Sequence, residues 1–369
     1  MQAYDVIVIG AGPAGIFTAL ELDKLMPQMR VLVVDSGSTI DNRSCPARTS
    51  SHCAHCRTCH IMNGWAGAGA FSDGKLSLSE EVGGNVTDYL PVQEVRDLIR
   101  YADDIYLKFG APDKVFGKSD KFAEQVSYEA HKHNIKLIPC PVRHMGTEYS
   151  FEVLREMYRY LSSRESFEFR EYTKADTIEI ENGRAAGVWL IGRDGERRLE
   201  KARYIVAAPG RGGAEWLTSI ARANSLQTIN NAVDIGVRVE VPNAVMDHLT
   251  KNLYEAKLVY YSDTFENKVR TFCMNPYGEV VSENTNGIVT VNGHSYEGAD
   301  KQTENTNFAL LVAKHFSEPF KDSNGYGESI ARLSNMLGGG VIVQRFGDLV
   351  RGRRSNCLLY TSDAADDLT

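Results

Sequence analysis

The first 35 residues alternate between apolar runs and a segment of helical spacing. Residues 5–9 form a short run rich in β-branched side chains, which is typical of a strand covered on both faces in a parallel sheet. Apolar residues then recur at helical spacing up to Met26, and Pro27 ends the segment. A second apolar run follows at residues 30–34. The pattern predicts a strand, a helix and a second strand.

Helical spacing returns in three later segments. Residues 92–109 carry apolar side chains on one face, with a proline before them and a Gly-Ala-Pro sequence after them. Shorter helices are predicted at residues 121–133 and 151–162, the second with Ser150 as its N-cap. We expect these helices to form an insertion, at about residues 91–165, in an N-terminal domain.

Strand patterns then replace the helical ones. A β-meander is predicted, with Asn182-Gly183 and Asp194-Gly195 as hairpin turns. A buried strand follows at residues 204–208, and a strand-like segment at 236–240 marks a domain boundary near Asp234. The runs of the meander are residues 167–170, 176–180, 185–191 and 197–199.

A glycine motif connects the first strand to the first helix. Residues 10–15, Gly-Ala-Gly-Pro-Ala-Gly, fit the spacing G-x-G-x-x-G. Gly10 permits a tight turn, Gly12 lets backbone approach a pyrophosphate, and Gly15 lets the helix pack on the strand. Free N–H groups at the helix N-terminus favour an anion. Asp35 follows the second strand, where an acidic residue accepts hydrogen bonds from a ribose. The predicted dinucleotide contacts here are Gly10, Gly12, Pro13, Ala14, Gly15, Asp35 and Ser36.

The rest of the chain holds no second motif of this spacing. The glycine clusters at residues 210–213 and 338–340 both lack it. One dinucleotide domain, an insertion, a β-meander and a strand that returns to the sheet are typical of flavoproteins with a single dinucleotide. FAD is therefore preferred over NAD.

Composition and charge narrow the class of protein. The 369 residues are 43% hydrophobic and 24% charged, enough for a sizeable core and two domains. A net charge of -7 gives no general reason to expect nucleic acid or a membrane as partner. No apolar run is long enough to span a bilayer, and Met1 leads into a strand without a signal sequence. We expect a cytoplasmic protein that acts on small molecules.

Several segments carry a resemblance to a known family. They are Cys45 with Cys53, Cys56 and Cys59, the decapeptide at residues 67–76 (Gly-Ala-Gly-Ala-Phe-Ser-Asp-Gly-Lys-Leu), and residues 143–147, 236–240 and 292–296. With these segments the chain resembles the bacterial FAD-dependent dehydrogenases of the glutathione-reductase-like flavoprotein class. Their span, from residue 5 to about 352, covers most of the sequence.

Pattern and resemblance together predict an α/β fold with two domains. Residues 1–234 would form the FAD-binding domain, a Rossmann-like parallel sheet with the β-meander and the helical insertion. Residues 235–335 would form a second, mixed-sheet substrate domain. Residues 336–356 would begin a return to the first domain.

The C-terminal end departs from the family pattern. The family closes its site with a glycine-rich strand and helix, and nothing after Gly347 supplies them. Residues 357–369 resemble a translated sequencing adapter, so we expect the natural sequence to stop near Asn356 here and the chain to be truncated. A genuine disordered terminus is the alternative.

The resemblance also implies where the cofactor lies. The decapeptide would lie against the flavin, residues 173–175 would pass the adenine, and residues 208–211 would return beside the dinucleotide. Ala175 stands where the family usually has valine. Lys75 would stabilise negative charge on the reduced flavin, and a solvated lysine in a structural turn is the alternative. The predicted contacts are Gly67, Gly69, Ser72, Asp73, Lys75, Ala175, Ala208, Gly210 and Arg211.

Four cysteines lie within fifteen residues and are interleaved with histidines. Cys45, Cys53, Cys56 and Cys59 are candidate ligands of zinc or of an iron–sulfur cluster. A thiol pair that exchanges electrons with the flavin is a second interpretation, and inert reduced cysteines are a third.

Candidate catalytic residues come from the matching segments. His144 and His294 are candidate proton donors, because a histidine titrates near neutrality and hydride transfer is often paired with proton transfer. Tyr296 and Arg238 are candidates for orienting or neutralising an anionic substrate. A hydrogen-bonded structural role is the alternative for each of them.

The sequence thus predicts an FAD-dependent oxidoreductase that acts on an unidentified small organic molecule. Its electron donor or acceptor is unidentified, and NAD(P)H is one candidate. Two alternatives stay open. One is an electron-transfer flavoprotein that uses the cysteine cluster as a relay, and the other is a non-catalytic dinucleotide-binding sensor.

Overall fold

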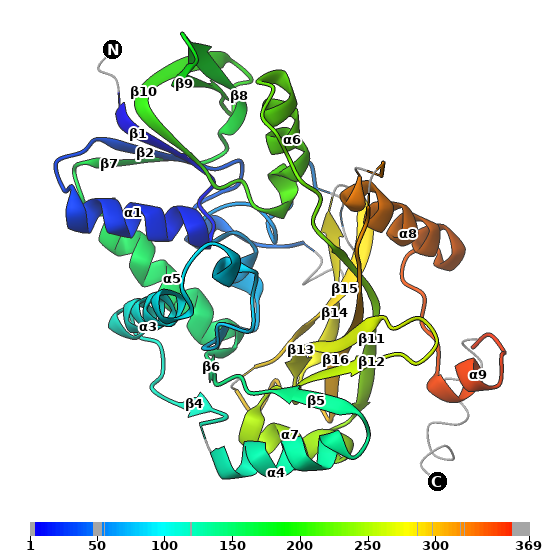
Figure 1. Cartoon of the computed structure of the whole chain (residues 1–369). Coiled ribbons are helices and arrows are strands. Elements are labelled where there is room, and N and C mark those ends of the chain that lie inside the picture. The colour runs from blue at the N-terminus through cyan, green and yellow to red at the C-terminus, as the bar shows by residue number, and fades with distance from the viewer. Residues whose placement is uncertain are drawn as a thin grey trace.

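The computed structural model describes residues 4–46, 54, 56–118, 120–285, 287–296, 298–317, 319–320 and 322–355. Two layered bodies are visible in Figure 1, one around β1 and α1 and the other around β11 to β16. Cys53 and the predicted adapter-like tail at 357–369 lie outside the described residues.

The first body is built on a six-stranded sheet with the order β7-β2-β1-β10-β9-β8. In its centre β1 pairs in parallel with both β2 and β10, and β2 pairs in parallel with β7. The other two strands complete an antiparallel meander with β10. The strands are β1 (Tyr4–Ile9), β2 (Val31–Val34), β7 (Phe167–Arg170), β8 (Lys174–Glu181), β9 (Arg184–Ile191) and β10 (Arg197–Ala207).

Two strand predictions for this sheet are wrong in detail. The run at residues 167–170 is not the first strand of the meander but β7, which continues the parallel sheet beyond β2. The two runs predicted at 197–199 and 204–208 form one strand, β10, which pairs first with β9 and then with β1. Strand pairing is a tertiary property, so an apolar run does not reveal which neighbour it finds.

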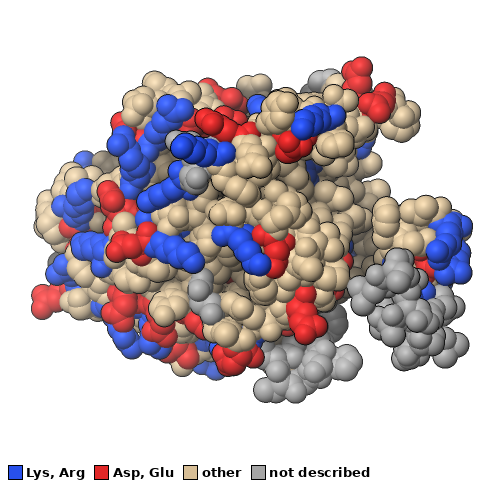
Figure 2. All heavy atoms as spheres, turned by 90° about the horizontal axis from the view of Figure 1, so that it is seen from below, with Lys and Arg blue, Asp and Glu red and all other residues tan. Residues whose placement is uncertain are grey.

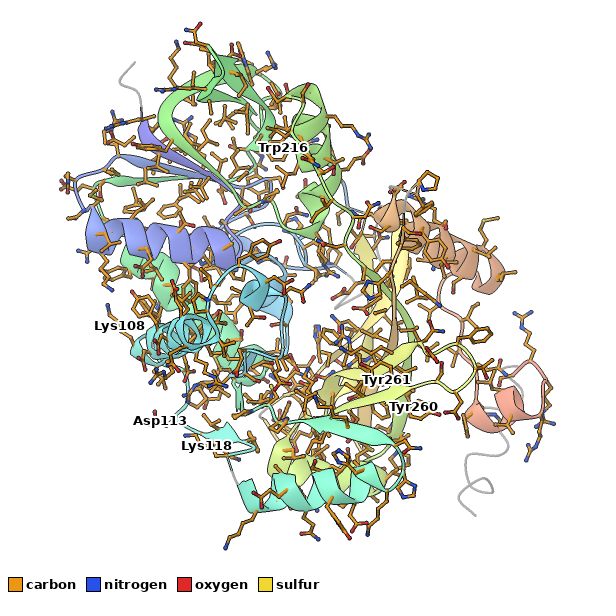
Figure 3. All side chains as sticks on the ribbon, viewed as in Figure 1. Lys108, Asp113, Lys118, Trp216, Tyr260 and Tyr261 are labelled. Carbon is orange, nitrogen blue, oxygen red and sulfur yellow. The ribbon has the colours of Figure 1, made fainter. Side chains whose placement is uncertain are left out.

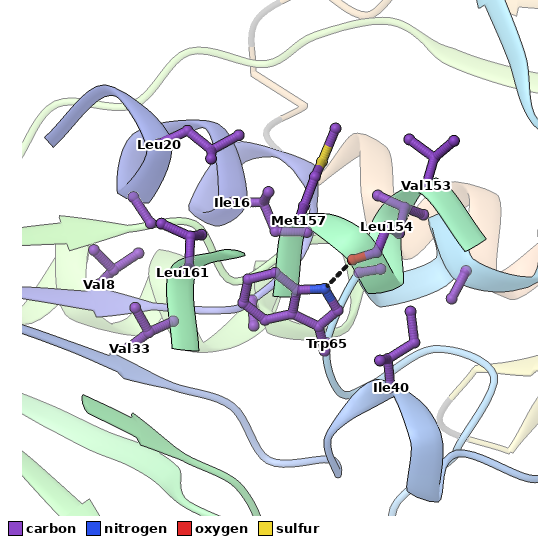
Figure 4. Packing of buried hydrophobic residues seen from close by; sticks show 14 of the residues in the cluster. Val8, Ile16, Leu20, Val33, Ile40, Trp65, Val153, Leu154, Met157 and Leu161 are labelled. Atoms are coloured by element: carbon purple, nitrogen blue, oxygen red, sulfur yellow. Dashed lines mark hydrogen bonds between the residues drawn. The ribbon is translucent and has the colours of Figure 1, made fainter. Parts of the chain in front are cut away.

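Helices cover the sheet and bury its apolar face. In Figure 4, side chains of α1 (Pro13–Leu25) and α5 (Gly146–Ser162) share one core with Trp65, whose Nε1 donates to the carbonyl of Leu154 at 2.9 Å. Each large apolar side chain buried here stabilises the fold by about 1.5–3 kcal/mol. The core includes Val8, Ile16, Leu20, Val33, Ile40, Val153, Leu154, Met157 and Leu161. α3 (Val92–Lys108) lies beside α5 (Figure 1).

The prediction of Ser150 as an N-cap is wrong, because α5 begins at Gly146. Residues of this first turn are buried against the short 3-10 helix η2 (Gly67–Phe71). The hydroxyl of Ser150 donates to the carbonyl of Gly69 at 3.4 Å instead of capping the helix. Contact with a distant segment therefore decides where this helix starts.

The second body is an antiparallel five-stranded sheet with the order β11-β16-β13-β12-β5. Its edge strand β5 comes from the segment predicted as an insertion into the first domain, and it pairs with β12. Helices α4 (Asp120–His131) and α7 (Asn243–Leu253) supply the side chains that pack with this sheet. The strands are β5 (Ile135–Ile138), β11 (Val233–Pro242), β12 (Lys257–Tyr261), β13 (Lys268–Asn275) and β16 (Asn305–Lys314).

Smaller elements complete the fold. The hairpin of β14 (Glu279–Thr285) and β15 (Ile288–His294) packs with β16, and α8 (Ser323–Gly338) packs on β15 and β11. Among the described residues after Gly338, none joins the six-stranded sheet. The helix α6 (Ala214–Ala223) is held by Trp216, whose indole donates to the carbonyl of Asp176 in β8 (Figure 3). The remaining helix is α9 (Phe346–Val350).

A small sheet lies between the two bodies. It has the order β3-β6-β4, and its strands are β3 (Lys75–Ser77), β4 (Val115–Phe116) and β6 (Val142–His144). Lys75 is directly opposite His144 in this sheet. The architecture confirms the predicted α/β class, with a Rossmann-like parallel sheet and a separate second sheet.

The surface and the helices add two observations. On the face shown in Figure 2, acidic and basic side chains are interspersed. None of the helices in the part of the chain that the structure describes has the length and apolar character needed to span a bilayer.

Candidate functional site

The three glycines of the fingerprint have different surroundings. Gly10 has φ of +99°, and a Cβ built on it would lie 2.1 Å from the carbonyl oxygen of Ala208 in the strand-end loop. A Cβ on Gly15 would lie 1.9 Å from the carbonyl oxygen of Gly10. By contrast, a Cβ on Gly12 would meet no atom of the described residues within 4 Å. Packing therefore requires Gly10 and Gly15, whereas Gly12 faces open space at the start of α1.

The N-terminus of α1 adds hydrogen-bond donors to this space. The helix has Gly12 as its N-cap and Pro13 as its first residue, and no side chain caps it. N–H groups in the first turn of such a helix have no intrahelical acceptor and attract an anion. An open position beside these donors suits the pyrophosphate of a dinucleotide.

Asp35 organises the loops next to this space. Its Oδ2 accepts from the N–H of Ala11 at 2.9 Å, and its Oδ1 accepts from the N–H groups of Gly37 and Gly64 at 2.8 and 2.7 Å. A carboxylate has about four acceptor positions, so one of them remains for a ribose hydroxyl. The side chain therefore both fixes the loops and keeps capacity for a ligand.

A buried arginine, which the sequence analysis missed, holds the loop before the decapeptide. The guanidinium of Arg43 donates to the carbonyls of His60, Ile61 and Trp65 at 2.5–2.9 Å and lies over the ring of Phe71. Burial lowers the pKa of Arg43 to about 10. Because Gly64, the residue before Trp65, donates to Asp35, the hydrogen bonds of Arg43 fix this loop relative to the predicted ribose position.

The decapeptide lies against the fingerprint. A Cβ on Gly67, which has φ of +53°, would lie 3.2 Å from the Cα of Gly12. A Cβ on Gly69 would lie 3.6 Å from Pro13. Ser72 closes the turn by donating from its hydroxyl to the carbonyl of Gly69. Glycines at these positions thus allow two segments far apart in sequence to meet at the start of α1.

Lys75 links the decapeptide to the second body. Its ammonium lies 3.1 Å from Asp73 and 3.2 Å from Glu255, and it donates to the carbonyl of Met274 at 2.7 Å. The side chain is only 8% exposed. Burial alone would lower the pKa of Lys75, but the two carboxylates raise it well above its ordinary range. The ammonium is therefore held in place as a permanent charge.

Glu255 is the central carboxylate of this network. It also accepts from the ammonium of Lys257 at 2.5 Å. Burial alone would raise the pKa of Glu255, but the charges of Lys75 and Lys257 lower it to about 2. The carboxylate therefore stays ionised at neutral pH.

His144 lies in a closed triangle of polar groups. Its Nε2 is 2.6 Å from the hydroxyl of Tyr254 and 3.1 Å from the hydroxyl of Ser295, and these two hydroxyls are 2.7 Å apart. All three residues are buried. The rings of His144 and Tyr254 also stack, with centroids 4.1 Å apart. We call these three residues the His144 triangle.

The backbone is strained where it presents Tyr254. This residue has φ of +60° and ψ of −57°, and the N–H of Glu255 donates to the carbonyl of Leu253 across it. Such a γ-turn is rare and costs on the order of 1–3 kcal/mol in a residue other than glycine. The turn directs Tyr254 toward His144 and Glu255 toward Lys75. Strain of this kind is often found at functional sites.

The other predicted catalytic residues are not all brought to this triangle. His294 is buried at the end of β15, next to Ser295. The hydroxyl of Tyr296 donates to Glu279 at 2.7 Å, on the exposed side of the hairpin. Arg238 lies in β11 and donates to Asn307, Asn292 and the carbonyl of Cys273.

The remaining predicted cofactor residues lie around the end of the parallel sheet. Ala208 contacts Gly10 as described above, and the hydroxyl of Ser36 donates to Asn63 at 3.2 Å. Arg211, next to Gly210, forms an ion pair with Glu283 of β14 at 3.3 Å. Ala175 is buried in the core on the opposite face of the sheet from α1.

The metal prediction is not settled by the described cysteines. Cys45, Cys56 and Cys59 are described, and Cys53 lies outside the described residues. Among the residues that the structure describes, no group of three or more His, Cys, Asp or Glu side chains could hold a metal ion. A metal site at these four cysteines stays a prediction.

Sequence reasoning missed Tyr254, Glu255 and Ser295 as well as Arg43. Ser295 could have been predicted, because it lies in the matching segment at residues 292–296. The others carry no local signal, since the strained turn at Tyr254 has neither glycine nor asparagine at its centre.

A family model matches the second body. Residues 232–365 match the model described as "FAD-dependent protein, C-terminal domain-like". The matched segment includes β11 to β16 and therefore carries Arg238, Tyr254, Glu255 and Ser295. No curated protein matches the sequence.

Solved structures of several flavoenzymes are similar at a low level. An L-amino acid deaminase from Proteus myxofaciens is 15% identical, with 65% of this chain and 51% of that chain covered and a TM-score of 0.38. The E. coli quinol fumarate reductase subunit is 13% identical, with 58% and 34% covered and a TM-score of 0.37. Glycine oxidase from Bacillus cereus is 14% identical, with 90% and 77% covered and a TM-score of 0.39.

The chain spans about half the length of the deaminase and about a third of the reductase subunit. Because the identities and TM-scores are this low, the function must be inferred from the site itself. The match at residues 232–365 connects the second body of the chain with FAD-dependent proteins.

Proposed function

We propose that this chain is an FAD-dependent oxidoreductase, a dehydrogenase of a small organic molecule. The observation that carries the proposal is the open space around the Cβ position of Gly12, the N-cap of α1. Packing accounts for Gly10 and Gly15, but nothing in the described protein accounts for an absent side chain at Gly12. Close approach of a pyrophosphate does account for it. The family match of the second body supports FAD as the dinucleotide.

The residues present fit this cofactor. The N–H groups at the start of α1 would hold the pyrophosphate, and Asp35 would accept from the ribose with its remaining position. Gly67 and Gly69 would let the decapeptide backbone approach the flavin end. When bound, FAD supplies an acceptor for a hydride.

Proton transfer is the part of the reaction that we assign to the His144 triangle. Oxidation of an alcohol or amine group releases a hydride and a proton, and the proton needs an acceptor of its own. The imidazole Nε2 and two hydroxyls lie within 2.6–3.1 Å of one another, so a proton can move among them without a large displacement of atoms. General acid–base groups of this kind contribute about 10²- to 10⁴-fold to a rate.

Lys75 and Glu255 have a positioning role in this proposal. Their ion pair joins the decapeptide to the turn that presents Tyr254. Lys75 is also opposite His144 in the small sheet. The pair thus holds the triangle at a fixed place relative to the decapeptide. Lys75 remains a positive charge near this loop, which would favour negative charge on a reduced flavin.

The binding part of the proposal is tested with two glycine variants. Gly12→Ala adds a methyl group where the fold has room, so the protein should fold but lose about tenfold or more of its affinity for FAD. Gly347→Ala is the matched control, since among the described residues its added Cβ would meet only Arg351, at 3.9 Å. Full-length protein is purified, and bound flavin is measured by absorbance and identified by mass after release. Equal FAD content in the parent and in Gly12→Ala would contradict the proposal.

The redox part is tested under anaerobic conditions. The flavin absorbance of the loaded protein is followed while small alcohols, amines, NADH and NADPH are added in turn. Bleaching by one donor, with formation of its oxidised product in equal amount, supports the dehydrogenase. Tightly bound flavin that no donor reduces would favour the alternative of a non-catalytic dinucleotide-binding sensor. Labile sulfide in anaerobically prepared protein would favour the electron-transfer alternative.

A further inference from the structure

We infer that Arg238 binds the carboxylate of the substrate, so that the enzyme acts on a small organic acid. This inference rests on the proposed function and adds the class of substrate to it. The first observation is how the charged side chains near the site are paired. Lys75, Lys257, Arg211 and Arg270 each form an ion pair with a described carboxylate. Arg238 has no carboxylate partner among the described residues, although it is half-buried.

The guanidinium of Arg238 is held rigidly by neutral acceptors. Nε donates to Oδ1 of Asn307 at 2.8 Å, Nη2 donates to the carbonyl of Cys273 at 2.7 Å, and Nη1 lies 3.4 Å from Oδ1 of Asn292. Arginine has five N–H groups, and these contacts use three of them. The two that remain are on Nη1 and Nη2. One N–H on each terminal nitrogen is the pair that a carboxylate accepts in a bidentate arrangement.

A second donor without an acceptor belongs to Asn307, the side chain that accepts from Nε of Arg238. Asn307 is completely buried, and its Nδ2 has no hydrogen-bond partner in the described structure. An unpaired buried N–H costs about 1–3 kcal/mol, so such groups usually mark a missing partner. An anion that contacts both Arg238 and Asn307 would supply the acceptor that this N–H group lacks. Asn307 is therefore an independent observation that points to the same kind of ligand.

The glycine of the matching segment at residues 292–296 belongs to the same cluster. A Cβ on Gly293 would lie 2.0 Å from Nη2 of Arg238, 2.1 Å from Oδ1 of Asn307 and 2.2 Å from Nδ2 of Asn275. Only glycine leaves room for the guanidinium and the two amides to converge. Four strands, β11, β13, β15 and β16, thus supply one polar cluster around Arg238, which has no ion-pair partner in the described part of the chain.

The cluster lies next to the decapeptide. Nη2 of Arg238 is bonded to the carbonyl of Cys273, and the thiol of Cys273 is 3.7 Å from the ammonium of Lys75. Lys75 is the ninth residue of the decapeptide. An anion bound by Arg238 would therefore be close to the segment that we expect beside the flavin.

The charge and the geometry favour a carboxylate over a phosphate. One uncompensated guanidinium balances a single negative charge, and its two free N–H groups lie in one plane, like the two oxygens of a carboxylate. A phosphate monoester carries nearly two charges at neutral pH. The neighbouring cations are already neutralised by Asp73, Glu255, Glu283 and Asp234.

The test uses the full-length protein with its bound flavin. Succinate and benzoate are added at constant ionic strength, with succinamide and benzamide as neutral analogues. Binding is followed by the visible absorbance of the flavin and by the midpoint of thermal unfolding. Arg238→Gln and Arg238→Lys are compared with Arg270→Gln, which removes the same charge from β13 of the same sheet.

We expect at least one carboxylate to bind saturably to the parent and to Arg270→Gln, and its amide to bind about tenfold more weakly or not at all. Binding should fall about tenfold or more in Arg238→Gln and less in Arg238→Lys, which keeps the charge but loses the planar pair of donors. Equal binding of acid and amide, or unchanged binding in Arg238→Gln, would overturn the inference. If Arg238→Gln does not fold, binding by Arg238→Lys and the comparison of each acid with its amide still test the inference.

The outcomes separate this inference from the proposed function. A protein that holds flavin but responds to neither carboxylate refutes the inference and leaves the oxidoreductase in place. A protein that holds no flavin refutes the proposed function itself, and the inference fails with it.

Discussion

The hydroxyl of Tyr254 lies 2.6 Å from Nε2 of His144, and the two rings stack on each other. His144 ends a strand of the small sheet, and Tyr254 belongs to the turn after α7 in the second body. Since the two residues are 110 positions apart, this contact is made only when both bodies have folded against each other. Together with the contacts of Ser295, it makes His144 part of a buried hydrogen-bonded cluster.

Tyr254→Phe should slow reduction of the bound flavin by about 10- to 100-fold, because it removes one hydroxyl from the triangle. The loss in unfolding free energy should be only about 1 kcal/mol, since His144 and Ser295 still contact each other. Rates are measured by anaerobic stopped flow across a range of pH with the donor found in the screen. Tyr261→Phe, on the exposed end of β12 in Figure 3, is the control. A parent-like rate and pH profile in Tyr254→Phe would exclude the proton role.

Glu255→Gln should lower the unfolding free energy at pH 7 by about 3 kcal/mol, because it leaves the buried ammonium of Lys257 without its carboxylate. Glu156→Gln is the control. Its exposed pair with Arg159 should contribute less than about 1 kcal/mol. Denaturant unfolding at constant salt measures both variants. A loss as small as that of Glu156→Gln would show that the buried network does not stabilise the junction.

The lowered pKa of Glu255 predicts that the unfolding free energy depends on pH. The pKa of Glu255 is about 2 in the folded protein and about 4.5 ordinarily, so its contribution is fully present above pH 4.5. It is lost as the pH falls from 4.5 toward 2, and Glu255→Gln should lack this component. Unfolding free energies at several pH values in this window measure the difference. Parallel curves for the parent and the variant would contradict the depressed pKa.

Asp35→Ala should weaken FAD binding by roughly 1–3 kcal/mol, because a ribose acceptor is lost and the N–H groups of Ala11, Gly37 and Gly64 lose theirs. Asp41→Ala removes an exposed carboxylate from the same part of the chain and is the control. Flavin titration of the apoprotein gives both affinities. Unchanged affinity in Asp35→Ala would reject the ribose role.

Single Ser replacements of Cys45, Cys56 and Cys59 should each remove the same metal equivalent if these thiols share a metal site with Cys53. Cys140→Ser replaces a buried cysteine that packs with Val142 and Tyr254, and it is the control. Metal content and labile sulfide are measured on protein prepared without air. Undiminished metal in the three variants, or a parent without metal, would leave the cysteines as redox or inert thiols.

Much of the dinucleotide unit could be read from local sequence. The run at residues 5–9, the glycines and Asp35 are consecutive parts of one β–α–β unit, and their order along the chain fixes their contacts. The turn at Gly10 and the close packing at Gly15 have the geometry expected from the spacing alone, whereas the role of Gly12 toward a pyrophosphate stays a prediction. The local sequence pattern was sufficient to predict this unit because the residues that contact one another in it lie within a few tens of residues along the chain.

The junction between the two bodies was not readable in this way. Glu255 becomes the partner of Lys75, and β5 joins the second sheet, through contacts between segments more than 100 residues apart. Ser150 was predicted to cap a helix, but its hydroxyl donates to the carbonyl of Gly69 in the decapeptide instead.

The sequence by itself determined the class of fold, the position of the dinucleotide fingerprint and the residues from which a site could be built. Only the tertiary structure decided which of them meet. It placed His144 with Tyr254 and Ser295 and enclosed Lys75 between two carboxylates, whereas Arg238 meets no carboxylate among the described residues. The reason is physical: strand and helix propensities depend on neighbours in the chain, whereas the pairing of buried charges and hydroxyls depends on neighbours in space.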